Sequence, residues 1–425
     1  MSRIIAAMSG LIISFLVLEN LSEEEQGFLY LMLSMRTFTL LTELGFYNVL
    51  VTYLSGCKIG DQTKNILKVE NWEYLSVLKK AKKWYILIAF IFFVIVLTWG
   101  YYSLLIFNNT PDLLAPWIVS TISLALTLYL NHILAAIEAL NDVAFVYVCR
   151  FKAAFYSLLF GIITMLSHQP LWSPAVIFLT TTIIVFYQLF KNYRNILFIN
   201  FQFSLSLKQT ISLKVKTNQM INMQWKMALS TLSGFLAFSV IVPITFFFSG
   251  AINAGKMGIS LTFVTALLSI GTALTAPKVS TMANLNNNKN FSVSLKLMKR
   301  TSIFIFILTT LSSLSLLFIL MILEANGVNY FKRMVSQELL FLLLFSGVSS
   351  SVILPIAYWL RSFGNEPLLG LSIVTGIFTF VGLIIGNIFG NIESVIIIYC
   401  VITFLSSLAV IFKYHMKINY LIGAK

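Results

Sequence analysis

The sequence predicts an all-α polytopic membrane protein, with about twelve transmembrane helices arranged as two six-helix halves around a central cavity. Of its 425 residues, 58% are hydrophobic and 10% are charged, whereas soluble domains carry roughly 45–50% apolar and about 25% charged residues. The apolar residues form continuous runs without the alternation of a β-barrel, which favours membrane-spanning helices. These observations exclude a soluble enzyme, a secreted disulfide-rich protein and a disordered chain.

The expected spans follow one another with short polar connections. In the first half they cover residues 4–18, 27–54, 84–107, 113–137, 144–166 and 171–190. In the second half they cover residues 226–249, 255–277, 301–323, 338–360, 367–388 and 393–413. The first run is interpreted as a retained helix rather than a signal peptide, because no A-x-A-like cleavage site precedes Glu19 and a second span follows closely.

The longest hydrophilic connection of the middle region predicts the division of the chain. It separates an N-terminal half, residues 1–200, from a C-terminal half, residues 226–425, with a cytoplasmic linker at 201–225. Two such halves are typical of duplicated transporter architectures.

The distribution of Lys and Arg predicts the orientation. If the side that carries the amino terminus is called inside, the inside segments hold 25 of the 29 basic residues. The positive-inside rule then places both termini in the cytoplasm. The net charge of +14 is thereby explained by topology and does not indicate a nucleic-acid partner.

Arg36, Glu43 and Lys256 are among the charged residues that fall inside expected spans, where ionisable groups are costly and usually functional. Arg36 lies near the middle of its span, and Glu43 follows seven residues later on the same helix face. Arg36 and Lys256 are candidate contacts for an anionic substrate, and Glu43 is a candidate ion-coupling acid. The alternatives are that Arg36 and Glu43 pair with neighbouring helices as structural locks, and that Lys256 extends to the membrane interface.

A second polar group lies around the fourth and fifth spans. Asn131 and His132 are candidate substrate contacts deep in the fourth span, with an interhelical hydrogen bond as the alternative. Glu138 is a second candidate coupling acid near the inner end of that span. Arg150 could receive a phosphate at a cytoplasmic entrance, although Arg150 and Lys152 are also what a positive-inside flank looks like.

Helix-breaking residues predict where the spans bend. Pro243, Pro355 and Gly234 are candidate conformational positions in the second half. Helices 1, 2, 7 and 8 are expected to face a cleft between the halves. The three cysteines and three histidines have no metal-ligand spacing, and nucleotide-binding motifs are absent, so neither a metal nor a cofactor is expected.

Three stretches resemble a known family. The segment from Phe15 to Gly56 resembles the start of the O-antigen flippases, polysaccharide exporters of the multidrug/oligosaccharidyl-lipid/polysaccharide (MOP) superfamily, which also holds the MATE antiporters. The matching residues are Leu21, Ser22, Glu24, Glu25, Gln26, Gly27, Glu43, Leu44 and Gly45. A second match is carried by Gln224, Lys226, Ser233, Gly234, Phe235, Pro243, Ala254, Gly255 and Gly258. A third, with Glu138 and Arg150, departs from the family at Ala139, where glycine is usual.

The resemblance implies a flippase of lipopolysaccharide biosynthesis rather than an enzyme. Its substrate would be an undecaprenyl-pyrophosphate-linked oligosaccharide, moved from the cytoplasmic to the periplasmic leaflet of the bacterial inner membrane by alternating access with a proton or sodium counter-ion. Gly45 joins the conformational candidates. Membrane lipid is an expected partner, and a polysaccharide polymerase complex stays open as another. The competing interpretations are a multidrug cation antiporter of the same superfamily and a membrane polysaccharide polymerase or glycosyltransferase.

Overall fold

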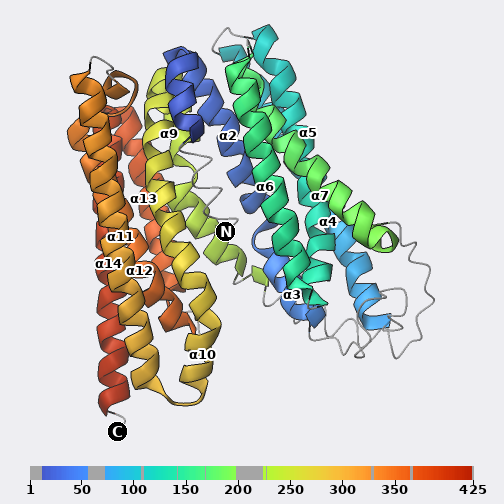
Figure 1. Cartoon of the computed structure of the whole chain (residues 1–425), viewed down its shortest axis with the longest axis vertical. Coiled ribbons are helices and arrows are strands. Elements are labelled where there is room, and N and C mark those ends of the chain that lie inside the picture. Colours follow the sequence, from blue (N-terminus) through green and yellow to red (C-terminus); the bar gives the residue numbers. More distant parts are fainter. Residues whose placement is uncertain are drawn as a thin grey trace. The chain divides into compact units, whose positions relative to one another are not determined.

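A computed structural model describes residues 12–55, 72–106, 110–140, 142–167, 169–197, 224–225, 227–326, 330–363 and 367–423. Throughout these ranges the chain is helical and contains no strand (Figure 1). Most of the first expected span and nearly all of the linker at 201–225 lie outside the described residues. The predicted all-α polytopic fold is confirmed by the described helices.

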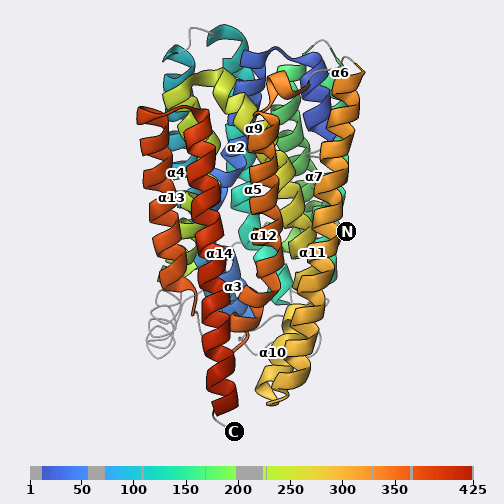
Figure 2. The ribbon, with the colours of Figure 1, turned by 90° about the vertical axis from the view of Figure 1, so that its left-hand side faces the viewer.

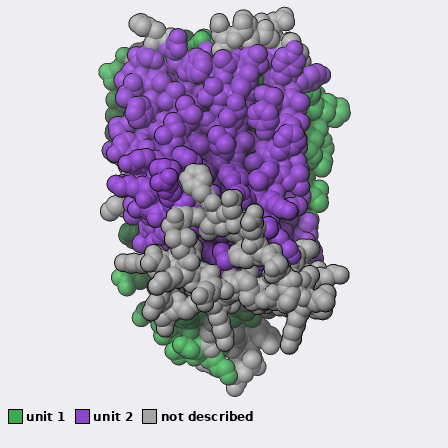
Figure 3. All heavy atoms as spheres, turned by 90° about the vertical axis from the view of Figure 1, so that its right-hand side faces the viewer, with its two compact units in different colours: residues 1, 3–31, 236–425 green, residues 2, 32–235 purple. Residues whose placement is uncertain are grey.

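The chain divides into two compact units, which Figure 3 shows in different colours. Unit 2 runs from residue 32 to residue 235, and unit 1 holds nearly all of the rest. The first helix and the start of the second therefore belong to the unit that contains the C-terminal spans. The predicted halves, 1–200 and 226–425, stay a prediction about the transport architecture.

Unit 2 is built from the second part of α2 and the helices that follow it. These are α2 (Glu23–Glu43), α3 (Phe46–Ser55), α4 (Trp72–Ile106), α5 (Thr110–Ala139), α6 (Val143–Leu166), the short η2 (Pro170–Trp172) and α7 (Ser173–Leu197). Helix α5 is central, because it packs against α3, α4 and α7, while α6 packs mainly on α7. Residues 227–235 of the next helix complete the unit.

Unit 1 contains the helical residues 12–20, the start of α2 and the C-terminal helices. These are α9 (Ile241–Thr275), η3 (Ala276–Lys278), α10 (Val279–Asn287), α11 (Phe291–Ala325), η4 (Tyr330–Arg333), α12 (Gln337–Arg361), α13 (Leu369–Phe389) and α14 (Ile392–Gly423). Helix α12 packs against α9, α11 and α14. Helix α10 and the C-terminal end of α14 lie at the same end of the unit (Figures 1 and 2).

The described helices have the length and surface of membrane spans. Nine stretches of the described chain are long and apolar enough to cross a bilayer. One of them, Met227–Lys278, contains two expected spans, which meet at Gly250 where the backbone adopts φ 85°. Large apolar side chains are exposed along the helices, such as Phe90, Phe304 and Phe378 at 64%, 53% and 63%. A soluble protein rarely exposes so many, and lipid is the solvent that suits them.

The second expected span, 27–54, is wrong as a single helix. The helix begins at Glu23, four residues before the expected start, where Ser22 and Glu25 form a reciprocal capping box with hydrogen bonds of 2.8 and 3.3 Å. The helix breaks at Leu44 and Gly45, which have φ values of 49° and 73°. A side-chain amide of Gln224 donates to the Leu44 carbonyl at 3.0 Å and so satisfies a backbone group that the break leaves free.

Glycines allow the start of α2 to approach α9 closely within unit 1. A Cβ added at Gly27 would lie 2.0 Å from the Ala251 carbonyl oxygen, and one at Gly258 would lie 2.5 Å from the Tyr30 ring. Small residues at helix contacts are a common device for packing membrane helices. Two glycines of the family resemblance are therefore packing residues in this structure.

Candidate functional site

Helix α2 carries two charged side chains in different surroundings. Arg36 is exposed, whereas Glu43, at the last residue of the helix, is buried with 7% of its surface accessible. Between residues 33 and 42, Met35 is the one buried residue. The sequence predicts that Arg36 and Glu43 share one helix face. On that face Arg36 is accessible, whereas Glu43 is not.

Glu43 is held by donors from two other helices of unit 2. The Tyr85 hydroxyl on α4 donates to Glu43 Oε1 at 2.5 Å, and the Asn131 amide on α5 donates to Oε2 at 3.3 Å. Hydrogen bonds offset the cost of placing a carboxylate in a buried position. Asn131, predicted as a substrate contact, therefore makes the interhelical hydrogen bond that was its alternative. We call Glu43, Tyr85, Asn131 and His132 the Glu43 cluster.

His132 completes the cluster through its ring. It is 3% exposed, its Nδ1 lies against the Tyr129 carbonyl, and its ring centroid lies 5.7 Å from that of Tyr85. Its next-turn neighbour Tyr129 lies 4.9 Å away, measured between ring centroids. The buried His132 ring therefore packs against Tyr85 and supports its position. Direct contact of His132 with substrate stays a prediction.

Glu138 and Arg150 meet through a tyrosine that sequence reasoning did not single out. The Tyr47 hydroxyl on α3 donates to Glu138 Oε2 on α5. The Arg150 guanidinium on α6 lies 4.9 Å from the centroid of the Tyr47 ring, in a cation–π arrangement. The structure thus brings together two residues that the sequence placed on separate helices.

Arg36 and Arg150, two exposed cations of unit 2, form no ion pair with a carboxylate among the described residues. No hydrogen bond or ion pair joins the Arg36 guanidinium to the described part of the chain, and Arg150 has the Tyr47 ring as its contact. Arg150 also lies within electrostatic reach of Arg36 and Glu43. The charge that this part of unit 2 offers to a ligand is therefore positive.

The remaining site candidates have separate positions. Within unit 1, Lys256 is half-buried on α9, Pro243 lies in the first turn of α9, and Pro355 lies inside the continuous helix α12. Within unit 2, Gly45 lies at the break after α2 with 2.9 Å between its added Cβ and the Thr231 hydroxyl. Gly234 has no atom within 4 Å of such a Cβ. The roles of these five residues stay predictions.

The sequence predicted no contact for three side chains of unit 2, although one of them, Gln224, belongs to the family resemblance. Two of them, Tyr47 and Tyr85, donate hydrogen bonds to Glu138 and Glu43. The third, Gln224, donates to the Leu44 carbonyl at the helix break. Tyrosines are common in membrane helices, and Tyr85 is 42 positions from Glu43 along the chain. Only the packing of the helices within unit 2 brings these side chains to their partners. The described residues contain no group of His, Cys, Asp or Glu that could hold a metal ion.

No protein-family model matches the chain, and no curated protein matches its sequence. Solved structures do match its shape. One is the inward-facing conformation of a multidrug resistance MATE family transporter of the MOP superfamily, with 12% identity, a TM-score of 0.60 and 98% of each chain covered.

A second is the lipid II flippase MurJ in an inward closed conformation, with 16% identity, a TM-score of 0.59, and 97% of this chain and 85% of that chain covered. A third is a MOP superfamily transporter from Pyrococcus furiosus, for which reverse polarity of the binding pocket suggests a different function. It has 13% identity, a TM-score of 0.53, and 99% and 94% coverage. The chain therefore has the all-α, multi-pass membrane fold of the MOP superfamily transporters.

Proposed function

We propose that the chain is a flippase for polyprenyl-diphosphate-linked oligosaccharides of the O-antigen type. It would move them from the cytoplasmic to the periplasmic leaflet of a bacterial inner membrane by ion-coupled alternating access. The proposal combines the fold, the sequence resemblance and the charge of the residues that unit 2 leaves accessible.

The observation that carries the proposal is the difference between the acids and the cations of unit 2. Glu43 is buried and accepts hydrogen bonds from Tyr85 and Asn131. Glu138 accepts a hydrogen bond from Tyr47. Arg36 and Arg150 are both exposed. A guanidinium binds phosphate oxygens through paired N–H groups, so accessible arginines favour a diphosphate substrate.

The same difference argues against the main rival, a multidrug antiporter. Organic cations call for an accessible carboxylate, and both acids of this region already have internal donors. Among the structural neighbours are both a multidrug transporter and a lipid II flippase. The fold allows either substrate class, and the accessible charge favours the anionic lipid.

Glu43 is the proposed coupling residue. A carboxylate held by one hydroxyl and one amide in a buried site can take up or release a proton, and its donors can reorganise when it does. Neutralisation of Glu43 would also change the electrostatic field at Arg150, which lies within its reach. This gives a physical connection between ion binding and the cation that would hold the diphosphate.

The experiment is transport in reconstituted vesicles that contain a polyprenyl-diphosphate-linked oligosaccharide. The full-length chain is expected to carry the saccharide across the bilayer. The measurement is the fraction of the saccharide that is protected from a glycosidase added outside the vesicles. Arg36→Ala is expected to reduce the rate to near the protein-free level while the variant still inserts and elutes as wild type. Arg194→Ala, an exposed cation at the end of α7, is the matched control and should transport normally.

Two results would contradict the proposal. Undiminished flipping by Arg36→Ala would remove Arg36 from substrate binding. Efflux of a fluorescent organic cation by the wild-type vesicles, without movement of the lipid-linked saccharide, would favour the multidrug antiporter.

A further inference from the structure

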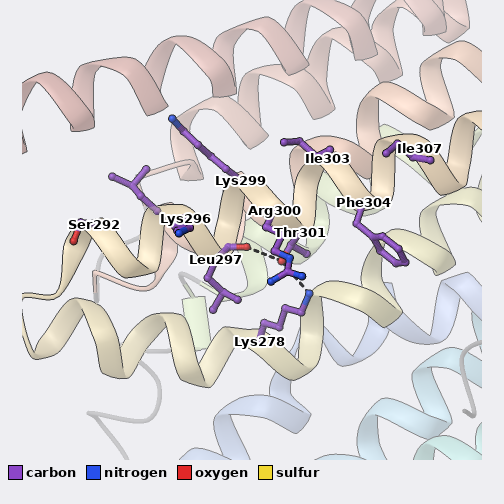
Figure 4. A pocket seen from close by; sticks show the side chains of 11 residues that line it. Lys278, Ser292, Lys296, Leu297, Lys299, Arg300, Thr301, Ile303, Phe304 and Ile307 are labelled. Carbon is purple, nitrogen blue, oxygen red and sulfur yellow. Dashed lines mark hydrogen bonds between the residues drawn. The ribbon is translucent and has the colours of Figure 1, made fainter.

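Unit 1 contains a basic pocket at the N-terminal end of α11, separate from the residues discussed above. Its cavity volume is about 770 Å³. Four cations line it: Lys278 from η3, and Lys296, Lys299 and Arg300 from α11 (Figure 4). None of the residues that line it is acidic. A cavity with four positive charges and no negative one is complementary to an anion.

One of these cations is held in place by a buried hydroxyl. The Lys278 ammonium donates to Thr301 Oγ at 3.0 Å, and the Thr301 hydroxyl donates in turn to the Leu297 carbonyl at 2.8 Å (Figure 4). Thr301 is 1% exposed. The hydrogen bond therefore fixes the amine of a long side chain that would otherwise lose rotamer entropy on binding a ligand.

The pocket continues directly into an apolar wall on the same helix. Ile303, Phe304 and Ile307 line it and are 61%, 53% and 51% exposed. They lie in the expected span 301–323, whereas Lys296, Lys299 and Arg300 immediately precede it. The pocket thus crosses the boundary between a basic helix end and a surface suited to acyl chains.

We propose that this pocket binds an anionic membrane phospholipid from the leaflet that topology predicts to be cytoplasmic. The headgroup phosphate would lie among Lys278, Lys296 and Arg300, and an acyl chain would lie along Ile303, Phe304 and Ile307. The inference goes beyond the proposed function, because it concerns a resident lipid and not the transported one.

The apolar wall is the reason for a lipid rather than a free phosphate. A soluble anion would contact the four cations but not the three large apolar side chains beside them. A phospholipid satisfies both parts at once, because its phosphate and acyl chain are joined across the same short distance. Basic residues near an anionic membrane surface add to this attraction.

The test is native mass spectrometry of the purified full-length protein in detergent, titrated separately with phosphatidylglycerol and phosphatidylcholine. Wild type is expected to retain phosphatidylglycerol preferentially. The double variant Lys278→Gln/Arg300→Gln should bind it about ten- to thirtyfold more weakly, since two cations are lost. The matched control Lys191→Gln/Arg194→Gln removes the same charge from the end of α7 and should bind normally.

A second variant keeps the test independent of folding. Thr301→Val preserves the shape of the buried side chain and every charge but removes the Lys278 tether, and should weaken phosphatidylglycerol binding by a smaller factor. Wild-type affinity in both the double variant and Thr301→Val would overturn the proposal. Displacement of phosphatidylglycerol by free pyrophosphate, or by an equimolar polyprenyl diphosphate, would also overturn it, because the pocket would then serve a soluble anion or the transported lipid.

Discussion

At the scale of single residues, the four candidate charged residues of unit 2 fall into two classes. The two acids, Glu43 and Glu138, each accept a hydrogen bond from a tyrosine. The two cations, Arg36 and Arg150, are exposed. The sequence identifies Arg36 and Glu43 as unusual, because ionisable residues in apolar spans are costly, and Glu138 and Arg150 as candidates near the ends of neighbouring spans. It does not show which of them are available to a ligand, since that depends on Tyr47 and Tyr85 from other helices.

Glu43→Gln is predicted to abolish the dependence of transport on the ion gradient while the protein still folds. The amide can accept the Tyr85 hydrogen bond in place of the carboxylate, but it cannot exchange a proton. The measurement is the pH profile of saccharide transport in vesicles, compared with wild type. An unchanged profile would remove Glu43 from the coupling role.

Tyr85→Phe is predicted to lower the free energy of unfolding by about 1–2 kcal/mol, because Glu43 loses one of its two donors in a buried site. Thermal unfolding of the detergent-solubilised protein measures the effect. Tyr101→Phe removes a hydroxyl from an exposed position of the same helix, α4, and is expected to change stability little. Equal stability of the two variants would show that the Tyr85 hydrogen bond contributes nothing measurable.

At the scale of elements, breaks and close contacts define the helices more sharply than hydropathy does. The span expected at 27–54 is two helices, because Leu44 and Gly45 adopt positive φ. The Gln224 amide donates a hydrogen bond to the Leu44 carbonyl at this break. The helix before Pro243 ends at residue 238, so this proline lies in a first turn where its missing N–H costs nothing. Pro355, by contrast, is accommodated within α12.

Gly45→Ala is predicted to destabilise the protein by about 1–2 kcal/mol, since alanine resists the left-handed backbone and its Cβ would meet Thr231. Gly234→Ala is the matched control in the same unit, where a Cβ meets nothing. Its stability should be unchanged or higher. A transport defect in a stable Gly234→Ala protein would instead support the predicted conformational role of this glycine.

Gly27→Ala is predicted to cost about 3 kcal/mol or more, because the new methyl group would overlap the backbone at Ala251. Gly370→Ala, in the first turns of α13, adds a methyl group in open space and is the control within unit 1. Expression level and thermal unfolding in detergent measure both. Tolerance of Gly27→Ala would mean that α2 and α9 do not approach so closely in the membrane.

At the scale of the whole molecule, membrane topology is the property that composition determines best. Helix α11 has 35 residues, about 52 Å at 1.5 Å per residue, which exceeds the bilayer core of about 30 Å. The helix is therefore long enough to cross the membrane, and we expect its two ends on opposite sides. The basic residues at its N-terminal end predict which side is cytoplasmic.

Cysteine labelling tests this topology. In a background where Cys57, Cys149 and Cys400 are replaced by serine, Lys289→Cys is expected to be protected from a membrane-impermeant maleimide in intact cells. Asn326→Cys, at the other end of α11, should react. Reaction of both, or the reverse pattern, would contradict the predicted orientation.

The sequence by itself determined the all-α membrane fold, the approximate spans and the residues whose charge is anomalous in lipid. It could do so because hydropathy and positive charge act locally along the chain, and each span carries its own signal. The tertiary structure alone decided that Tyr85 and Asn131 close Glu43 while Arg36 and Arg150 stay exposed, and that Lys278 meets Thr301 beside an apolar wall. Those outcomes depend on which helix faces pack together, because burial and hydrogen bonding are properties of neighbours far apart in the chain.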